Sequence, residues 1–274
     1  MGTHDWLGYF SDRFDCSAGA EPRRRYVILS PPRTGSNYVC GRLDNLADHL
    51  GVPMEYLHGD AIRALGARLL PGVSGAVGVD RYLDAVAAVR TTPDGWFGTK
   101  IQPAQLMPLF DGDIDRAAAF LRRFDRLIVL ARHDRLGQAI SGAIAHLTGV
   151  WFNFGEEPGL AERDIGRLLP VVHTLCQRYD HEDEVVRSLA ARLGDRPVLH
   201  LSYEEIEADP DAAFRRVTAF LGFDPRQAEE RSTVLTTRKP PGALAARIRA
   251  AYPAFAASGS GRAPGNAGPG QRIE

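Results

Sequence analysis

Short runs of apolar residues alternate along this chain with longer segments in which apolar residues recur every three or four positions. The run Tyr26–Ser30 precedes a segment with Val39, Leu43, Leu46 and Leu50 on one helical face. Strands and helices that alternate in this way predict an α/β fold, in which helices cover both faces of a parallel sheet. The predicted strands are 26–30, 95–101, 126–131 and 197–202, and the predicted helices are 36–50, 80–90, 114–124, 134–148, 161–193 (which Pro170 could interrupt) and 211–221.

Three segments lack this periodicity. Residues 1–22 are aromatic and acidic and predict no regular element, and the glycine-rich segment 59–79 predicts an irregular insertion over the candidate site. From Ser258 onward the sequence is rich in Gly, Pro and Ser, which predicts a disordered tail. A chain of 274 residues could hold one large α/β domain or two small ones, and we expect a single domain over 1–257 followed by the tail 258–274.

The formal net charge of −1 excludes a general electrostatic attraction to nucleic acids or membrane surfaces, so any basic site must be local. Among the 33 basic residues there are two lysines, Lys100 and Lys239. No apolar run approaches the length of about 18 residues that a membrane span needs. The N-terminus also lacks the pattern of a signal peptide. We therefore expect a cytoplasmic protein without a membrane span.

Three cysteines, Cys16, Cys40 and Cys176, lie far apart in the sequence. They form no C-x-x-C pair and no disulfide framework, which agrees with a reducing compartment. Cys40 falls within the first predicted helix, where we interpret it as a packing residue rather than a nucleophile. No group of His, Cys, Asp or Glu has the spacing of metal ligands, and we expect no metal site.

A polar loop with the sequence PPRTGS joins the first predicted strand to the first predicted helix. The N–H groups in the first turn of a helix have no partner inside the helix, and the helix dipole favours negative charge at this end. The loop therefore predicts a phosphate site, although a strand–turn–helix without a ligand is the simpler alternative. The residues that we assign to this site are Arg33, Thr34, Gly35, Ser36 and Asn37.

The loop differs from a Walker A loop, which requires G-x-x-x-x-G-K-[ST] with a lysine for the β- and γ-phosphates. Gly35 is the loop's single glycine, and no lysine follows it. An ordinary ATPase or kinase is therefore disfavoured, although a P-loop-type metabolite kinase stays an alternative function. A non-catalytic nucleotide-binding protein of the same fold is a further alternative.

The strand, the PRTGS loop, the helix and the following Glu55-Tyr56 pair resemble the sulfotransferases that use 3′-phosphoadenosine-5′-phosphosulfate (PAPS). Among these enzymes the chain is most similar to the bacterial trehalose 2-sulfotransferase family, over roughly residues 24–224. The resemblance implies a P-loop-like sulfotransferase fold, PAPS as the donor, adenosine 3′,5′-bisphosphate as its product, and a homodimer. Its specificity lies in the order and spacing of four further segments: Phe97-Gly-Thr-Lys100, Arg132–Ser141, Thr148-Gly-Val-Trp151 and Leu201-Ser-Tyr-Glu-Glu205.

The resemblance also implies which residues bind the two anionic ends of the donor. The loop would bind the 5′-phosphosulfate. Arg132 and Ser141 would bind the 3′-phosphate, because an Arg and a Ser at this spacing do so in the family. Tyr203 would contact the adenine, although it could equally be a packing aromatic. Arg238, followed by Lys239, resembles an element that holds the 3′-phosphate in cytosolic animal sulfotransferases, but two prolines follow here and depart from that pattern.

Sulfuryl transfer needs a base that takes the proton of the acceptor hydroxyl. In the family the Glu of the Glu-Tyr pair is the proposed base, so the resemblance points to Glu55, with His58 as the competing candidate. Lys100 would neutralise charge on the oxygen that bridges phosphate and sulfate. Cytosolic animal sulfotransferases carry Lys-x-His near this position. Gln102 stands here in place of that His, which favours Glu55 as the base.

The acceptor is the least defined part of the predicted site. Trp151, Phe152 and Phe154 could stack on a sugar, form a subunit contact or fill the core, and the core is the commonest place for such side chains. We expect a small-molecule or glycan acceptor that offers a hydroxyl of a carbohydrate, glycolipid or secondary metabolite. The leading hypothesis is thus a PAPS-dependent sulfotransferase.

Overall fold

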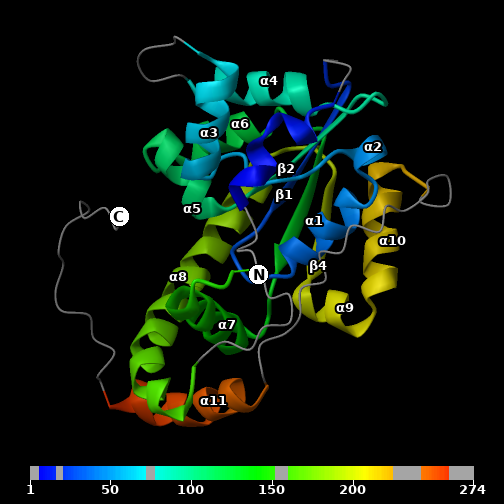
Figure 1. Cartoon of the computed structure of the whole chain (residues 1–274). Coiled ribbons are helices and arrows are strands. Elements are labelled where there is room, and N and C mark those ends of the chain that lie inside the picture. Colours follow the sequence, from blue (N-terminus) through cyan, green and yellow to red (C-terminus); the bar gives the residue numbers. More distant parts are fainter. Residues whose placement is uncertain (1–5, 17–20, 72–77, 152–159, 225–241, 259–274) are drawn as a thin grey trace. The chain divides into compact units, whose positions relative to one another are not determined.

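The computed structural model of this protein describes residues 6–16, 21–71, 78–151, 160–224 and 242–258 (Figure 1). Its internal contacts divide the chain into two compact units. The first unit comprises Met1–His133 and Tyr179–Thr237, and the second comprises Asp134–Arg178 and Arg238–Glu274.

The first unit is built on a parallel sheet of four strands in the order β2-β1-β3-β4 (Figure 1). Strand β1 lies between two neighbours, and its residues from Tyr26 to Leu29 are completely buried. Apolar runs of this kind are typical of strands that are covered on both faces. All four predicted strands are confirmed, with ends that differ by no more than two residues: β1 (Arg24–Leu29), β2 (Trp96–Ile101), β3 (Arg126–Ala131) and β4 (Val198–Ser202).

Helices cover both faces of this sheet, which confirms the predicted α/β architecture. Side chains alternate along β1, so that Val27 and Leu29 join one apolar cluster whereas Tyr26 and Ile28 join another. The helices that pack in the first cluster include α3 (Gly59–Leu69), α4 (Val79–Arg90), α6 (Ile114–Leu121) and the C-terminal part of α8 (Ile165–Ala191). The second is completed by α1 (Ser36–Asp44), α2 (Ala47–Leu50), α9 (Tyr203–Ala208) and α10 (Pro210–Leu221).

Two long predicted helices differ in detail from those observed. The segment 36–50 forms two helices, because a turn at Asn45 and Leu46 separates α1 from α2. In this turn the N–H of Leu46 donates to the carbonyl oxygen of Leu43 at 2.9 Å, a tighter pattern than that of an α-helix. Pro170 lies inside α8 and does not interrupt it, and a 3₁₀ helix, η4 (Glu162–Asp164), precedes α8.

The prediction of an irregular segment over 59–79 is wrong for its first half, which forms α3. His58 caps this helix, because its Nδ1 accepts a hydrogen bond from the N–H of Asp60 at 3.2 Å. Ala61 and Leu65, one turn apart, are completely buried in the first apolar cluster. The glycines of this segment indicate an irregular structure, and the prediction followed them. The helix forms nevertheless, because packing of its buried face stabilises it more than the low helix propensity of glycine disfavours it. Residues 72–77 lie outside the described residues.

Two short 3₁₀ helices, η1 (Trp6–Phe10) and η2 (Asp12–Phe14), lie within residues 1–22, for which no regular element is predicted. Arg90, the last residue of α4, holds this segment in place. Its guanidinium donates to the carbonyl oxygens of Tyr9 at 3.1 Å and Ser11 at 2.9 Å. Because these contacts come from a residue far along the chain, no local pattern indicates them.

The second unit contains α7 (Arg135–Thr148), the N-terminal part of α8 and α11 (Gly242–Ala257). Helix α7 confirms the predicted helix 134–148. Its N-cap residue Asp134 pairs with Arg249 of α11 at 2.5 Å, and His173 of α8 contacts the hydroxyl of Tyr252 at 3.0 Å. Helix α11 was not predicted, because its alanine-rich sequence lacks a strong apolar face. The segment 259–274 lies outside the described residues, so the domain boundary and the disordered tail stay predictions.

Candidate active site

The loop between β1 and α1 is shaped by two residues in the left-handed region of backbone space. Gly35, the N-cap of α1, has a φ of 83°, and Arg33 has a φ of 63°. Gly35 has no side chain to cap the helix, and the N–H of Tyr38 donates to the Gly35 carbonyl oxygen at 3.0 Å. The N–H groups of Ser36 and Asn37 are thus the ones placed for an external acceptor. Thr34 is completely buried, and its hydroxyl donates to the carbonyl oxygen of Pro31 at 3.0 Å. The Thr34 hydroxyl therefore stabilises the shape of the loop.

Helix α9 packs against this loop. A Cβ atom at Gly35 would lie 3.3 Å from Ile206 Cδ1 and 3.4 Å from Tyr203 Cδ2. This close approach and the positive φ together favour glycine at position 35. Helix α9 itself begins at the end of β4, where the Ser202 hydroxyl accepts a hydrogen bond from the N–H of Glu205 at 3.1 Å. The loop and Tyr203 are thus neighbours at the carboxyl ends of their strands.

Arg132 follows β3 at the same edge of the sheet and connects the loop with Tyr203. Its guanidinium donates to the Arg33 carbonyl oxygen at 3.3 Å and lies 3.9 Å from the centroid of the Tyr203 ring. Burial lowers the pKa of the Arg33 guanidinium, and the positive charge of Arg132 also lowers it. The charge of Arg132 thus acts on Arg33, and an anion beside the two residues would relieve this repulsion. The structure therefore brings four predicted donor-site residues together: Arg33, Gly35, Arg132 and Tyr203.

A second cluster forms around Glu55 at the carboxyl end of β2. Met54 forms a parallel bridge with Thr99 of β2, and its carbonyl oxygen accepts a hydrogen bond from the N–H of Lys100 at 2.9 Å. These contacts fix the adjacent Glu55 beside the strand. The Lys100 ammonium lies 2.6 Å from Glu55 Oε1 and donates to Asn37 Oδ1 at 2.5 Å. Because Asn37 belongs to the first turn of α1, Lys100 connects the predicted base with the predicted donor loop.

Two further side chains hold Glu55, and neither is among the predicted site residues. Gln102 Nε2 donates to Glu55 Oε1 at 3.1 Å, and Gln105 Nε2 donates to Glu55 Oε2 at 2.5 Å. Both lie where β2 passes into the short helix α5 (Pro103–Leu106), which a 3₁₀ helix, η3 (Met107–Phe110), follows. The sequence offers one signal for Gln102: it stands two residues after Lys100, where the cytosolic animal sulfotransferases carry a His.

The environment of Glu55 favours its ionised form. Burial by itself would raise the pKa of Glu55, but the charge of Lys100, hydrogen bonds from Lys100 and Gln105, and the charge of His58 outweigh burial and lower the pKa below its usual range. The side chains of Glu55 and Lys100 are 13% and 5% exposed, so water screens this ion pair poorly. A carboxylate held in this way is deprotonated near neutral pH, as a base must be.

Three further predicted site residues are Ser36, Ser141 and Arg238. Ser36 is the first residue of α1 and is buried, and Ser141 is buried on α7 in the second unit. Arg238 lies outside the described residues. Trp151 is 46% exposed, and the two phenylalanines considered with it for the acceptor lie outside the described residues.

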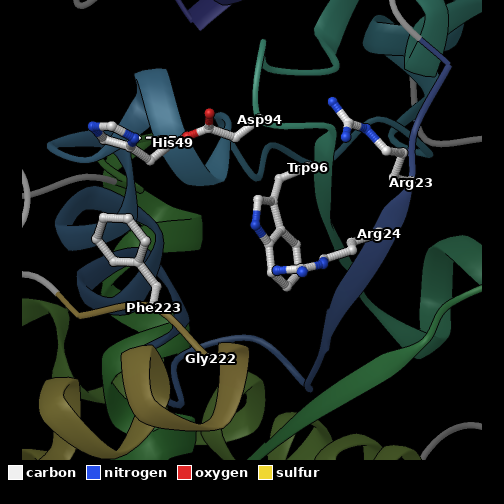
Figure 2. A pocket seen from close by; sticks show the side chains of 7 residues that line it. All are labelled: Arg23, Arg24, His49, Asp94, Trp96, Gly222 and Phe223. Atoms are coloured by element: carbon white, nitrogen blue, oxygen red, sulfur yellow. Dashed lines mark hydrogen bonds and ion pairs between the residues drawn. The ribbon is translucent and has the colours of Figure 1, made fainter.

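A pocket of about 360 Å³ lies at the opposite edge of the sheet, where β1 and β2 begin (Figure 2). The Arg24 guanidinium lies 5.2 Å from the centroid of the Trp96 ring, and His49 Nδ1 lies 2.8 Å from the carboxylate of Asp94. This pocket contains none of the predicted site residues, so we place the candidate chemistry at the carboxyl edge. The lining is completed by Arg23, Gly222 and Phe223.

Among the described residues, no group of three or more His, Cys, Asp or Glu side chains is arranged to hold a metal ion. Of the helices in the part of the chain that the structure describes, none is long and apolar enough to cross a membrane.

Several solved structures are similar to this chain at low sequence identity. The sulfotransferase domain of the olefin synthase from Synechococcus PCC 7002 is 18% identical, with a TM-score of 0.44 over 84% of this chain and 88% of that one. A sulfotransferase from Alicyclobacillus acidocaldarius is 15% identical, with a TM-score of 0.44 over 86% of this chain and 96% of that one. A retinol dehydratase in complex with androsterone and the inactive cofactor PAP is 15% identical, with a TM-score of 0.40 over 90% of this chain and 68% of that one. No curated protein matches the chain.

The model of one protein family, described as Stf0 sulphotransferase, matches residues 25–240. This range is well over half of the chain, and it includes the loop and both clusters at the carboxyl edge of the sheet. It also agrees with the range of the sulfotransferase resemblance in the sequence. The chain therefore belongs to the Stf0 sulphotransferase family.

Proposed function

We propose that this protein transfers the sulfuryl group of PAPS to a hydroxyl of a carbohydrate, glycolipid or secondary metabolite. The observation that carries this proposal is the buried pair of Glu55 and Lys100 beside the first turn of α1. At the carboxyl edge of a parallel sheet, next to an anion-binding loop, these two residues offer a base and a cation. Membership of the Stf0 family supports the same chemistry.

The donor has anionic groups at both ends of its nucleoside, and the described residues offer a suitable group for each. The first turn of α1, with Arg33, Ser36 and Asn37, would bind the phosphosulfate. Arg132 offers a planar fork of donors to the 3′-phosphate, and Tyr203 offers an aromatic face to the adenine. The Arg132 guanidinium contacts the Arg33 backbone, and its charge lowers the pKa of Arg33, which supports the fit of an anion beside the two residues.

The remaining donor residues follow from the resemblance alone. Ser141 would add a hydroxyl to the 3′-phosphate, and Arg238 would add a second guanidinium. Thr34 would act through the shape of the loop, because its hydroxyl donates to Pro31.

In the proposed reaction the acceptor oxygen forms a bond to sulfur as the bond from sulfur to the bridging phosphate oxygen breaks. Glu55 takes the proton of the acceptor hydroxyl. Lys100 stabilises the negative charge that the bridging oxygen gains, and adenosine 3′,5′-bisphosphate leaves. His58 is the alternative base, since its side chain is 42% exposed, although its Nδ1 caps α3.

The resemblance also supports a homodimer, whereas the cysteine pattern and the net charge support a cytoplasmic protein without a nucleic-acid partner. Light scattering coupled to gel filtration tests the dimer. A mass near 60 kDa, twice the 29.9 kDa of one chain, supports it, whereas a mass of one chain across the concentrations tested contradicts it.

The experiment that tests the function is titration calorimetry with adenosine 3′,5′-bisphosphate, run beside ATP and 5′-AMP. We expect the bisphosphate to bind at least tenfold more tightly than either, a difference of about 1.4 kcal/mol. Binding equal to or weaker than that of ATP contradicts the donor site and favours the kinase alternative. Turnover of PAPS with a panel of hydroxyl acceptors, with Glu55→Gln as the inactive control, then distinguishes an enzyme from a non-catalytic nucleotide-binding protein.

A further inference from the structure

The Glu55 carboxylate is held by one charged and two neutral groups. Lys100 is the charged group at 2.6 Å, and the side-chain amides of Gln102 and Gln105 are the neutral ones, at 3.1 and 2.5 Å. The two amides bind different carboxylate oxygens. An ion pair alone lets a carboxylate rotate about its partner, whereas hydrogen bonds to both oxygens fix its plane.

The glutamines are themselves anchored by the backbone. Gln105 Oε1 accepts a hydrogen bond from the N–H of Gln102 at 3.3 Å. The N–H groups of Gln105 and Leu106 donate to the Gln102 carbonyl oxygen at 2.9 and 3.1 Å. Pro103, at the start of α5, restricts the backbone between them. The amides are therefore aimed at Glu55 before any ligand binds, which limits the entropic cost of holding it.

Lys100 is not tied to Glu55 in the same way. Its ammonium is shared between Glu55 and Asn37. Because Asn37 lies in the first turn of α1, an anion at the loop competes with Glu55 for this cation. The amides of Gln102 and Gln105 carry no charge, so such an anion does not draw them away.

We propose that Gln102 and Gln105 are positioning residues that keep the Glu55 carboxylate in one orientation when Lys100 engages the donor. This inference rests on the proposed role of Glu55 as the base. Neither glutamine exchanges a proton in the reaction; each acts by holding Glu55.

Titratable groups approach Glu55 from three elements. Lys100 belongs to β2, and His58 lies at the N-cap of α3, where its Nδ1 is 3.6 Å from the carboxylate of Asp60. Cys40 lies on α1, and burial raises the pKa of its thiol to about 12, so it is uncharged near neutrality. Substituting a glutamine leaves all of these groups in the protein, so a change in the titration of Glu55 reports on the lost amide.

The test follows the titration of Glu55 by carbon-13 NMR in protein labelled at the glutamate carboxyl carbon, with Glu55→Gln to identify the resonance. The variants are Gln105→Leu and Gln102→Leu, with Gln177→Leu at an exposed position on α8 as the matched control. We expect Gln105→Leu and Gln102→Leu each to raise the titration midpoint of Glu55 by about one pH unit. One unit corresponds to about 1.4 kcal/mol, close to the worth of a hydrogen bond to a charged group. We expect the control to leave the midpoint in place.

Unchanged midpoints in both variants overturn the proposal. If Gln105→Leu fails to fold, Gln105→Glu replaces the donor with a like charge of similar shape and should raise the midpoint further. Gln105→Leu should also shift the titration midpoint of Glu55 when Lys100 has been replaced in Lys100→Met. If the shift disappears there, Gln105 does not act on Glu55 independently of Lys100. If adenosine 3′,5′-bisphosphate binds no more tightly than ATP, the proposed function itself is contradicted. If it binds as expected but the glutamine variants leave the titration midpoint of Glu55 unchanged, only the role of the glutamines is contradicted.

Discussion

The Lys100 ammonium lies 2.6 Å from Glu55 Oε1 in a site where both side chains are almost fully buried. The same ammonium contacts Asn37 in the first turn of α1. One cation therefore connects β2, the segment after α2 and the helix that follows the loop. Charges shielded from water interact strongly, so a change at any of these three residues should alter the others.

Lys100→Met should raise the pKa of Glu55 above its usual range, because burial is the largest influence on that group and the opposing charge is removed. Leaving one charge of a buried pair without its partner costs about 3–5 kcal/mol. We expect a loss of this size in the free energy of unfolding at pH 7, measured with urea. Arg187→Met, at an exposed ion pair, is the control and should change stability by less than about 1 kcal/mol. Equal effects of the two substitutions would contradict the prediction.

The stability of the wild type relative to Glu55→Gln should depend on pH in one direction. Because folding lowers the pKa of Glu55, its ionised form stabilises the native state above its unfolded pKa of about 4.3. This contribution is lost as the pH falls through the lower, folded pKa. Urea unfolding between pH 7 and pH 3 should therefore show the advantage of the wild type shrinking. A difference that stays constant with pH would mean that folding does not change the pKa of Glu55, and a difference that grows as the pH falls would mean that folding raises it.

Gly35→Ala should destabilise the first unit and weaken binding of adenosine 3′,5′-bisphosphate. The backbone there has a φ of 83°, and the new Cβ would approach Ile206 within 3.3 Å. Left-handed backbone costs a residue with a Cβ about 1–2 kcal/mol. The matched control is Gly66→Ala inside α3, where no atom lies within 4 Å of the added Cβ, and it should stabilise the protein by about 0.5–1 kcal/mol. In thermal unfolding, Gly35→Ala should lower the melting temperature and Gly66→Ala should raise it. A higher melting temperature in Gly35→Ala would be inconsistent with the loop geometry.

Arg132→Ala should weaken binding of the bisphosphate by about 1.5–3 kcal/mol, the worth of hydrogen bonds to a charged group. Arg132→Lys should recover only part of this affinity, because a lysine keeps the charge but loses the planar fork and the stacking on Tyr203. Calorimetry measures both, with Arg187→Ala as a control at an exposed position. Unchanged affinity in Arg132→Ala would remove Arg132 from the donor site.

Cys40 should resist alkylation in the native protein. Burial raises the pKa of its thiol to about 12, so the reactive thiolate is scarce at pH 8. Cys16 and Cys176 are partly exposed and should react first with iodoacetamide, as peptide mass spectrometry would show. Rapid modification of Cys40 before unfolding would mean that α1 opens readily.

The strands illustrate what local sequence patterns can determine. The run from Tyr26 to Leu29 is apolar because both faces of β1 are covered, and such a run is recognisable without knowing what covers it. Local sequence patterns did not predict helix α3. Its buried residues Ala61 and Leu65 stand among glycines, and packing against the sheet stabilises a helix that propensity alone disfavours.

The sequence by itself determined the four strands and most of the helices between them. It also marked the loop after β1, Glu55 and Lys100 as site candidates. Each depends on neighbours within a few positions or on a short motif. Only the tertiary structure decided that Asn37, Lys100 and Glu55 meet, and that Gln102 and Gln105 hold the carboxylate from 47 and 50 residues away. Such contacts depend on the register of parallel strands and the packing of helices between them, which no local pattern of apolar and polar residues records.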